Sequence, residues 1–209
     1  RAFKYVFEPA VALLAIRNTD VEPKAEDVMV PVVLDYHGTS AEGISVLVFA
    51  ISFDTNIVTV RDVVLGESAQ SAGKNIHMYL GDDGLIRVAV SGGTSVIEQG
   101  VVCLLDISLD IGSRRGMGTK LRFEEVSASS PDGYELQLDT RPGVIRVGRS
   151  YDCNSDGAVD AIDIQHVINF ALKAATGLDD IAAEIADGDL DGDIDAVDIQ
   201  MVINKTLGL

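Results

Sequence analysis

The sequence predicts a mainly β protein, in which a β-sandwich is followed by a small α-helical domain. Three observations lead to this fold class. Short stretches rich in β-branched and aromatic residues recur through residues 1–148, separated by Gly, Asp, Ser and Pro. After residue 160 the apolar residues fall at helical spacing instead. Residues 151–209 also carry 13 acidic but only 2 basic side chains. We therefore expect one domain at residues 1–148 and a second at 149–209, with almost no linker.

The strands of the first domain are expected at seven short runs. The candidate runs are 30–34, 44–53, 85–90, 101–111, 121–123, 134–138 and 144–147. Part of the fourth run alternates between apolar and polar residues, as a half-buried strand does. Many short strands bounded by turn residues are typical of a β-sandwich. No long amphipathic helix is expected before residue 160.

Composition excludes several function classes. The 209 residues carry a formal charge of −17, which argues against nucleic acid and anionic membranes, because phosphate binding needs clustered Lys and Arg. The apolar runs fall short of the roughly 18–20 residues that a membrane-spanning helix needs. Three scattered histidines form no nucleophile–base motif. Glu124 and Glu125 are adjacent, so on a strand they point to opposite faces rather than into one glycosidase cleft. We expect no catalytic residues and no enzyme activity.

An internal repeat marks the second domain. Residues 152–169 match residues 187–204 with an offset of 35, and 11 of the 18 positions are identical. Each copy ends in Ile-Gln-x-Val-Ile-Asn, which places apolar residues on one helical face. The repeat therefore predicts two copies of one loop–helix unit.

Both copies have the spacing of a calcium loop. Acidic or amide side chains stand at loop positions 1, 3, 5, 9 and 12, and Gly stands at position 6. A hard dication takes about 6–8 oxygen ligands, which alternate residues of a tight loop can supply. Position 7 would donate a backbone carbonyl. The predicted ligands are Asp152, Asn154, Asp156, Ala158, Asp160 and Asp163 in the first loop, and Asp187, Asp189, Asp191, Asp193, Asp195 and Asp198 in the second. We expect two bound Ca²⁺ ions, without which the second domain should be poorly folded, because uncompensated carboxylates repel one another.

Two features keep alternative interpretations open. Cys103 and Cys153 form no metal-type cluster, so either one disulfide or two free thiols is compatible with the sequence. Cys103 on an apolar strand is expected to be a buried small hydrophobe, whereas Cys153 at loop position 2 should point away from the metal. Phe3, Tyr5 and Phe7 alternate with other residues and indicate either an edge strand or a strand donated to a neighbouring sheet.

A calcium loop followed by one helix, duplicated within about 60 residues, resembles a dockerin module. The residues before the first loop leave no room for the entering helix of an ordinary EF-hand. Position 12 is Asp in both loops, where the EF-hand pattern has Glu. The resemblance implies a non-catalytic module that binds cohesin modules in extracellular complexes such as cellulosomes. It also implies a partner-binding face formed by loop positions 10 and 11 and the outer helix surface. Carried over, this face comprises Ala161, Ile162, Gln165, His166, Asn169, Ala196, Val197, Gln200, Met201 and Asn204. Many dockerins have Ser-Thr at positions 10 and 11, so the aliphatic residues here imply a more apolar interface.

The order and spacing of the strands in the first domain are similar to those of a cohesin jelly-roll sandwich. This resemblance implies that the chain carries a socket as well as a plug. The leading hypothesis is a calcium-dependent extracellular subunit that polymerises head to tail with copies of itself. One alternative is a cellulosome-type adaptor that binds a different cohesin and a different dockerin. Another is a carbohydrate-binding sandwich, although the chain has no Trp and only 5% aromatic residues.

Overall fold

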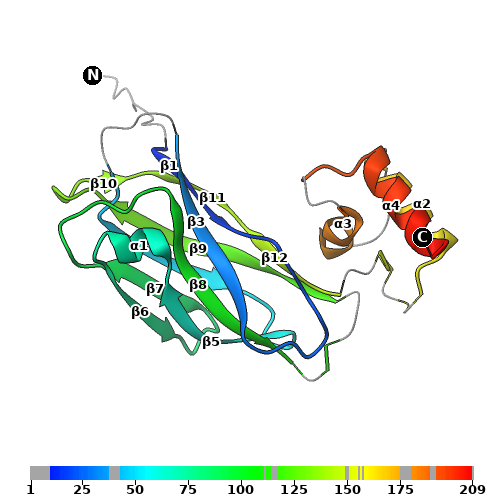
Figure 1. Ribbon diagram of the computed structural model, residues 1–209, viewed down its shortest axis with the longest axis horizontal. Coiled ribbons are helices and arrows are strands. Elements are labelled where there is room, and N and C mark those ends of the chain that lie inside the picture. The colour runs from blue at the N-terminus through cyan, green and yellow to red at the C-terminus, as the bar shows by residue number, and fades with distance from the viewer. Residues whose placement is uncertain are drawn as a thin grey trace, which may run out of the picture.

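The computed structural model describes residues 10–37, 43–110, 112–113, 117–148, 151–154, 156, 158–174, 180–188 and 192–208. Phe3, Tyr5 and Phe7 lie outside these residues. The described part forms an elongated β-sandwich with a small helical unit at one end (Figure 1). The predicted fold class, a mainly β jelly-roll sandwich followed by a small helical domain, is confirmed.

The first sheet of the sandwich has five strands in the order β11-β1-β3-β8-β5. Its strands are β1 (Ala12–Ile16), β3 (Val28–Tyr36), β5 (Val58–Leu65), β8 (Gly100–Leu109) and β11 (Leu138–Arg141). A short helix, α1 (Glu67–Ser71), follows β5 and contacts β8.

The second sheet has the order β2-β12-β9-β4-β7-β6, and β10 pairs with β9 outside this path. Its strands are β2 (Thr19–Val21), β4 (Val46–Ser52), β6 (Asn75–Leu80), β7 (Ile86–Ser91), β9 (Gly118–Ser129), β10 (Glu135–Leu136) and β12 (Gly143–Val147).

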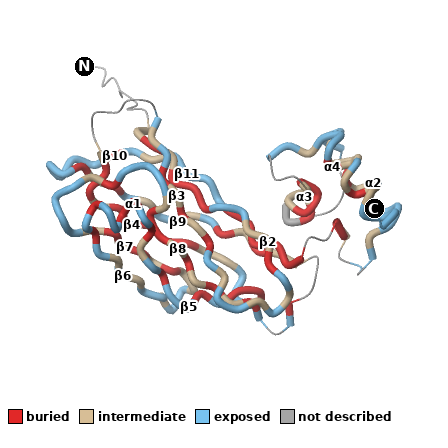
Figure 2. The backbone as a smooth tube through the Cα atoms, in the orientation of Figure 1, coloured by how far each residue is buried: buried red, intermediate tan, exposed pale blue. Residues whose placement is uncertain are grey.

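Alternation of apolar side chains explains how the two sheets pack. In β7, Ile86, Val88 and Val90 are buried, whereas the residues between them are half-buried. Facing strands contribute fully buried side chains such as Phe49 and Leu105, so a continuous core lies between the sheets. Figure 2 shows this core as buried stretches along the inner strands.

The first two strands of the sandwich pair in parallel with its last two strands. β1 runs parallel to β11 in the first sheet, and β2 runs parallel to β12 in the second. Only Arg17 and Asn18 separate β1 from β2, so the chain changes sheets within two residues. The predicted run 134–138 is split between β10 and the start of β11, and β1, β2, β5 and β6 were not predicted.

The helical unit contains α2 (Ala161–Ala171), α3 (Asp180–Ala186) and α4 (Ala196–Thr206). α2 and α4 begin directly after the two predicted loops, as the repeat indicates. α3 was not predicted, and it supplies an entering helix for the second loop only. A small separate core holds the unit together, built around Tyr151, Cys153, Val167, Ile185, Ala186 and Val202.

Candidate calcium loops and docking surfaces

The Asp at position 12 closes each loop in the same way. In the first loop, Asp163 is fully buried, and its Oδ1 accepts from the backbone N–H of Cys153 at 2.8 Å. Its Oδ2 accepts from the backbone N–H of Asp160 at 2.9 Å. In the second loop, Asp198 accepts from the backbone N–H groups of Gly188 at 2.7 Å and Asp195 at 2.8 Å. The short Asp side chain therefore suffices to close both loops, and it joins their first and last turns.

The Asp at position 9 begins the helix that follows each loop. Asp160 Oδ1 accepts from the backbone N–H of Ile162, and Asp195 Oδ1 accepts from that of Val197, both at 2.7 Å. Together with the position-12 carboxylates these contacts form a capping box at the start of α2 and of α4. The same acids that would bind a cation thus also fix where the helices start.

The first loop brings its early oxygen ligands together. The backbone N–H of Asp156 donates to Asp152 Oδ1 and to Asn154 Oδ1, both at 3.0 Å. Asp156 Oδ1 in turn accepts from the backbone N–H of Ala158 at 2.9 Å. Asp152 is buried, Asn154 is half-buried, and Asp156, Ala158 and Asp160 are exposed. The side chains at positions 1, 3 and 5 therefore lie on one side of a tight turn.

The second loop is described only in part, since Asp189 and Asp191 lie outside the described residues. Asp187 is buried, and its Oδ2 accepts from the backbone N–H of Gly192 at 3.1 Å. Gly192 has a φ of +95°, a backbone conformation that favours glycine. Asp193 and Asp195 are exposed.

The chemistry of these loops fits a hard cation. Within the described part of the chain, no three acidic, His or Cys side chains converge as a ready-made metal cluster. However, burial raises the pKa of the Asp163 carboxyl, and the nearby Asp152 carboxylate adds to the rise. Each carboxylate oxygen that accepts one N–H keeps a lone pair for another partner. A bound dication would neutralise the buried carboxylates and hold the alternate oxygens together.

Both cysteines are free thiols in the structure. Cys103 is fully buried in the sandwich, as expected, and burial raises the pKa of its thiol to about 12. Cys153, expected to point away from the metal, is only 3% exposed and packs in the core of the helical unit. Burial, with smaller contributions from Asp163 and Asp152, raises the pKa of the Cys153 thiol to about 12.

The predicted partner-binding residues of the helical unit lie mainly at its surface. Ile162 and Val197 are 52% and 49% exposed, so they do not form the packing between the repeats. Gln165 Nε2 donates to Asn169 Oδ1 at 2.9 Å, and Gln200 Nε2 donates to Asn204 Oδ1 at 2.8 Å. Two residues of the set differ. Met201 packs partly against the core, and His166 is half-buried with a buried Nδ1 that has no partner among the described atoms. Ala161, Gln165, Ala196 and Gln200 are exposed, whereas Asn169 and Asn204 are half-buried.

A second exposed surface, the outer face of the second sheet, lies on β4, β6 and β7. It comprises Val48, His77, Tyr79, Arg87 and Ala89. The register places Val48 opposite Ala89, and Tyr79 opposite Arg87. Val48 is 41% and Tyr79 is 62% exposed. Arg87 is held by Asp83 through two contacts, of 3.1 Å and 2.6 Å. The face therefore presents an aromatic ring and aliphatic side chains around a fixed cation.

A third set of residues, which the sequence did not indicate, joins the two units. We call it the seam, formed by Asp20, Lys120 and Arg146 of the sandwich and by Glu184 and Asp187 of the helical unit. Arg146 Nη1 donates to the carbonyls of Glu184 at 2.7 Å and Asp187 at 2.9 Å. Lys120 Nζ lies 3.4 Å from Glu184 Oε1. The helical unit thus meets the sandwich through α3 and the start of the second loop.

Comparison with known proteins found similar proteins for both units. The profile of the dockerin type I domain matches residues 150–207. Among solved structures, the sixth cohesin of scaffoldin B from Acetivibrio cellulolyticus, solved in complex with a dockerin, is 19% identical with a TM-score of 0.58, and the match covers 66% of this chain and 99% of that chain. A cohesin from Clostridium thermocellum, also solved in complex with a dockerin, is 15% identical with a TM-score of 0.57, covering 68% and 98%. The non-cellulosomal cohesin of the archaeon Archaeoglobus fulgidus is 16% identical with a TM-score of 0.55, covering 68% and 94%. A search of curated proteins found no match.

The two parts of the chain therefore differ in kind. Its sandwich has the cohesin fold, and residues 150–207 form a dockerin type I domain. Dockerin type I domains are non-catalytic, take part in cellulosome-type protein–protein assembly and typically lie outside the cell or at its surface. Type I dockerins bind calcium.

No helix among the described residues is both long and apolar enough to cross a membrane.

Proposed function

We propose that this protein is a non-catalytic extracellular subunit that polymerises head to tail in the presence of calcium. The dockerin module of one copy would bind the sandwich of the next. The observation that carries the proposal is the presence of both modules in one chain, each with an exposed apolar surface of its own. A contact between two different surfaces is heterologous, and it repeats into rings or open filaments.

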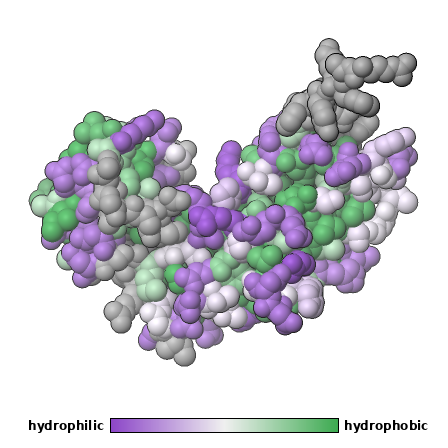
Figure 3. All heavy atoms as spheres, turned by 180° about the vertical axis from the view of Figure 1, so that it is seen from behind, coloured by the Kyte–Doolittle hydropathy of each residue, from purple (hydrophilic) through white to green (hydrophobic). Residues whose placement is uncertain are grey.

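The plug in this proposal is the second domain, residues 149–209, loaded with two Ca²⁺ ions. Each loop holds one ion through the six positions predicted from the sequence. The partner face surrounds Ile162 and Val197, which occupy equivalent places at the starts of α2 and α4. Figure 3, which views the molecule from the side opposite to Figure 1, shows hydrophobic surface on the helical unit.

The socket in this proposal is the outer face of the second sheet, within residues 1–148. Tyr79 offers a large side chain of low conformational entropy, and Val48 and Ala89 add apolar area beside it. The contacts of the seam fall instead on Lys120 and Arg146. The five residues of this outer face make none of the contacts of the seam, which leaves them open to another copy.

Complementary variants test this directional contact. The plug variant carries Ile162→Asp and Val197→Asp, and the socket variant carries Val48→Asp and Tyr79→Ala. All four side chains are exposed, so both proteins should fold. In millimolar calcium we expect the wild type to form large species by analytical ultracentrifugation and filaments by electron microscopy. Each variant alone should be monomeric, and an equimolar mixture should stop at the dimer, because only one competent contact remains.

Two other results would replace the proposal. A wild type that stays monomeric in calcium but captures a foreign cohesin or dockerin would identify an adaptor. Binding to glycans that Tyr79→Ala abolishes would identify a carbohydrate-binding sandwich.

A further inference from the structure

Arg146 is the central residue of the seam. It lies on β12 and is 5% exposed, so its guanidinium is almost completely removed from water. Its Nε donates to Asp20 Oδ1 at 2.8 Å, which fixes the side chain from the sandwich. Its Nη1 then donates to the carbonyls of Glu184 and Asp187. One side chain of the sandwich therefore holds two backbone groups of the dockerin module.

The two carbonyls occupy places where a cation is effective. Glu184 lies in the last turn of α3, whose final carbonyls have no partner within the helix. The C-terminus of a helix carries partial negative charge, which a guanidinium stabilises. Asp187 is position 1 of the second calcium loop. Arg146 thus caps α3 and fixes the backbone at the first residue of that loop.

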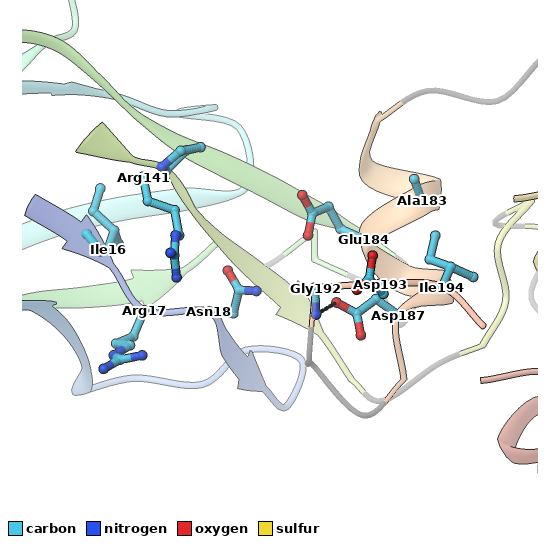
Figure 4. A pocket seen from close by; sticks show the side chains of 12 residues that line it. Ile16, Arg17, Asn18, Arg141, Ala183, Glu184, Asp187, Gly192, Asp193 and Ile194 are labelled. Atoms are coloured by element: carbon cyan, nitrogen blue, oxygen red, sulfur yellow. Dashed lines mark hydrogen bonds between the residues drawn. The ribbon is translucent and has the colours of Figure 1, made fainter. Parts of the chain in front are cut away.

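Charge across the seam is complementary. A groove of about 690 Å³ lies between the two units at the seam. Arg17 and Arg141 line it from the sandwich, and Glu184, Asp187 and Asp193 line it from the dockerin module, as Figure 4 shows. The acidic side of the dockerin module therefore faces one of the basic regions of a chain that has only 16 Lys and Arg.

We propose that calcium binding to the second loop and docking of the dockerin module on its own sandwich are coupled through Arg146. This inference rests on the proposed calcium site in the second loop. Asp187 contributes to both events, since its carbonyl accepts from Arg146 while its Oδ2 closes the loop on Gly192. Arg146 orders the backbone that the ion needs, and the ion in turn orders the carbonyl that Arg146 binds. By linkage, each event strengthens the other by the same factor.

The coupling makes the two calcium sites of the chain unequal. The second site draws additional affinity from the sandwich through Arg146, whereas the hydrogen bonds of Arg146 do not reach the first loop. The docked module keeps Ile162 and Val197 exposed, so the seam and the partner face are used at the same time.

Calcium titration of the full chain by isothermal calorimetry tests the coupling. The background is the plug variant, which keeps heats of assembly out of the measurement. Asp163→Asn and Asp198→Asn, added singly, assign the two sites. We expect Arg146→Met to weaken the second site about tenfold, the equivalent of roughly 1.4 kcal/mol from lost charge-assisted hydrogen bonds, and to leave the first site unchanged. Arg146→Lys keeps the positive charge but lacks the several N–H donors of the guanidinium, so part of the loss of calcium affinity at the second site should remain.

Small-angle scattering on the same proteins gives the reciprocal measurement. In calcium, Arg146→Met should have a larger radius of gyration than the parent protein. Removal of calcium should also raise the radius of gyration of the parent protein. Unchanged affinity of the second site in Arg146→Met, with an unchanged radius, would overturn the coupling. If Arg146→Met loses the β signal in circular dichroism, it has not folded. A double variant with Lys120→Gln and Glu184→Gln then takes its place in both measurements. These two substitutions at a partly exposed pair should weaken the second site two- to threefold, and no weakening would overturn the inference. A parent protein that binds a single ion would instead refute the two-ion part of the proposed function.

Discussion

The two calcium loops share a sequence pattern but differ in their surroundings. In both, the Asp at position 12 binds the backbone of positions 2 and 9 with nearly equal distances. At position 2, however, the first loop has Cys153, whose side chain enters the core. The second loop has Gly188 there, and the ring of Tyr151 lies against it. The second loop is also preceded by α3 and held by Arg146.

The two copies agree in the residues that close the loops and differ in the residues around them. The residues that would bind calcium and begin the helices are kept in both copies, because loop closure needs them. The residues around the loops have diverged, so that the first copy supplies a core side chain and the second supplies an attachment to the sandwich. Equal ligand patterns therefore do not imply equal sites.

Removal of calcium is expected to have the largest effect on this comparison. At a thousandfold excess over its dissociation constant, an ion bound to one loop would stabilise the folded module by about 4 kcal/mol. Chelation should therefore abolish most of the helical signal in circular dichroism and leave the β signal. A helical signal that survives chelation would show that the small core is sufficient without the ions.

Thiol alkylation with a maleimide gives a control within the same chain. Cys153 should become reactive on chelation, whereas Cys103, fully buried in the sandwich, should stay protected. Equal reactivity of both thiols would indicate that the whole chain unfolds.

Gly188→Ala is expected to have the next largest effect. A Cβ at this position would lie 2.5 Å from Tyr151 Cε1, so the ring or the loop must move. We expect a loss of about 1–3 kcal/mol of stability for the dockerin module in thermal unfolding monitored at helical wavelengths. In a Tyr151→Ala background the same substitution should cost much less. If the two substitutions had additive effects on stability, the contact with the Tyr151 ring would not be the cause of the loss in Gly188→Ala.

The smallest expected effect concerns the edge of the seam. Lys120 and Glu184 are partly exposed and their charged atoms lie 3.4 Å apart. Lys120→Gln should therefore cost about 0.5 kcal/mol or less in urea unfolding of the full chain, and the difference should vanish in high salt. A loss that persists in molar salt would mean that the lysine acts through packing rather than charge.

Local patterns allowed much of the dockerin module to be predicted. Loop spacing and the repeat indicate both helix starts, since the capping acids lie within three residues of them. α3 left a weaker signal, in which Ile181 and Ile185 are four residues apart and Asp180 precedes them. A helix of seven residues is shorter than the window over which periodicity is clear.

Long-range packing limited the prediction elsewhere. Arg146 alternates with apolar residues on β12, so its position predicts an exposed side chain. It is buried because α3, about 40 residues further on, covers it, and no local pattern encodes that contact. The outer face of the second sheet also depends on strand register, which places Tyr79 beside Arg87. The burial of Cys153 was not predicted for the same reason, since the core it enters is built from residues of both repeats.

The buried guanidinium of Arg146 has a mechanical consequence for the proposed fibre. Because it ties the plug of each subunit to that subunit's own socket domain, every subunit would add to the fibre at one constant angle. The pitch and handedness of the fibre would then depend on this junction together with the contact between subunits. Pulling along the fibre axis would load the two hydrogen bonds by which Arg146 holds the dockerin module. Calcium concentration would thereby set the stiffness of the fibre as well as its length.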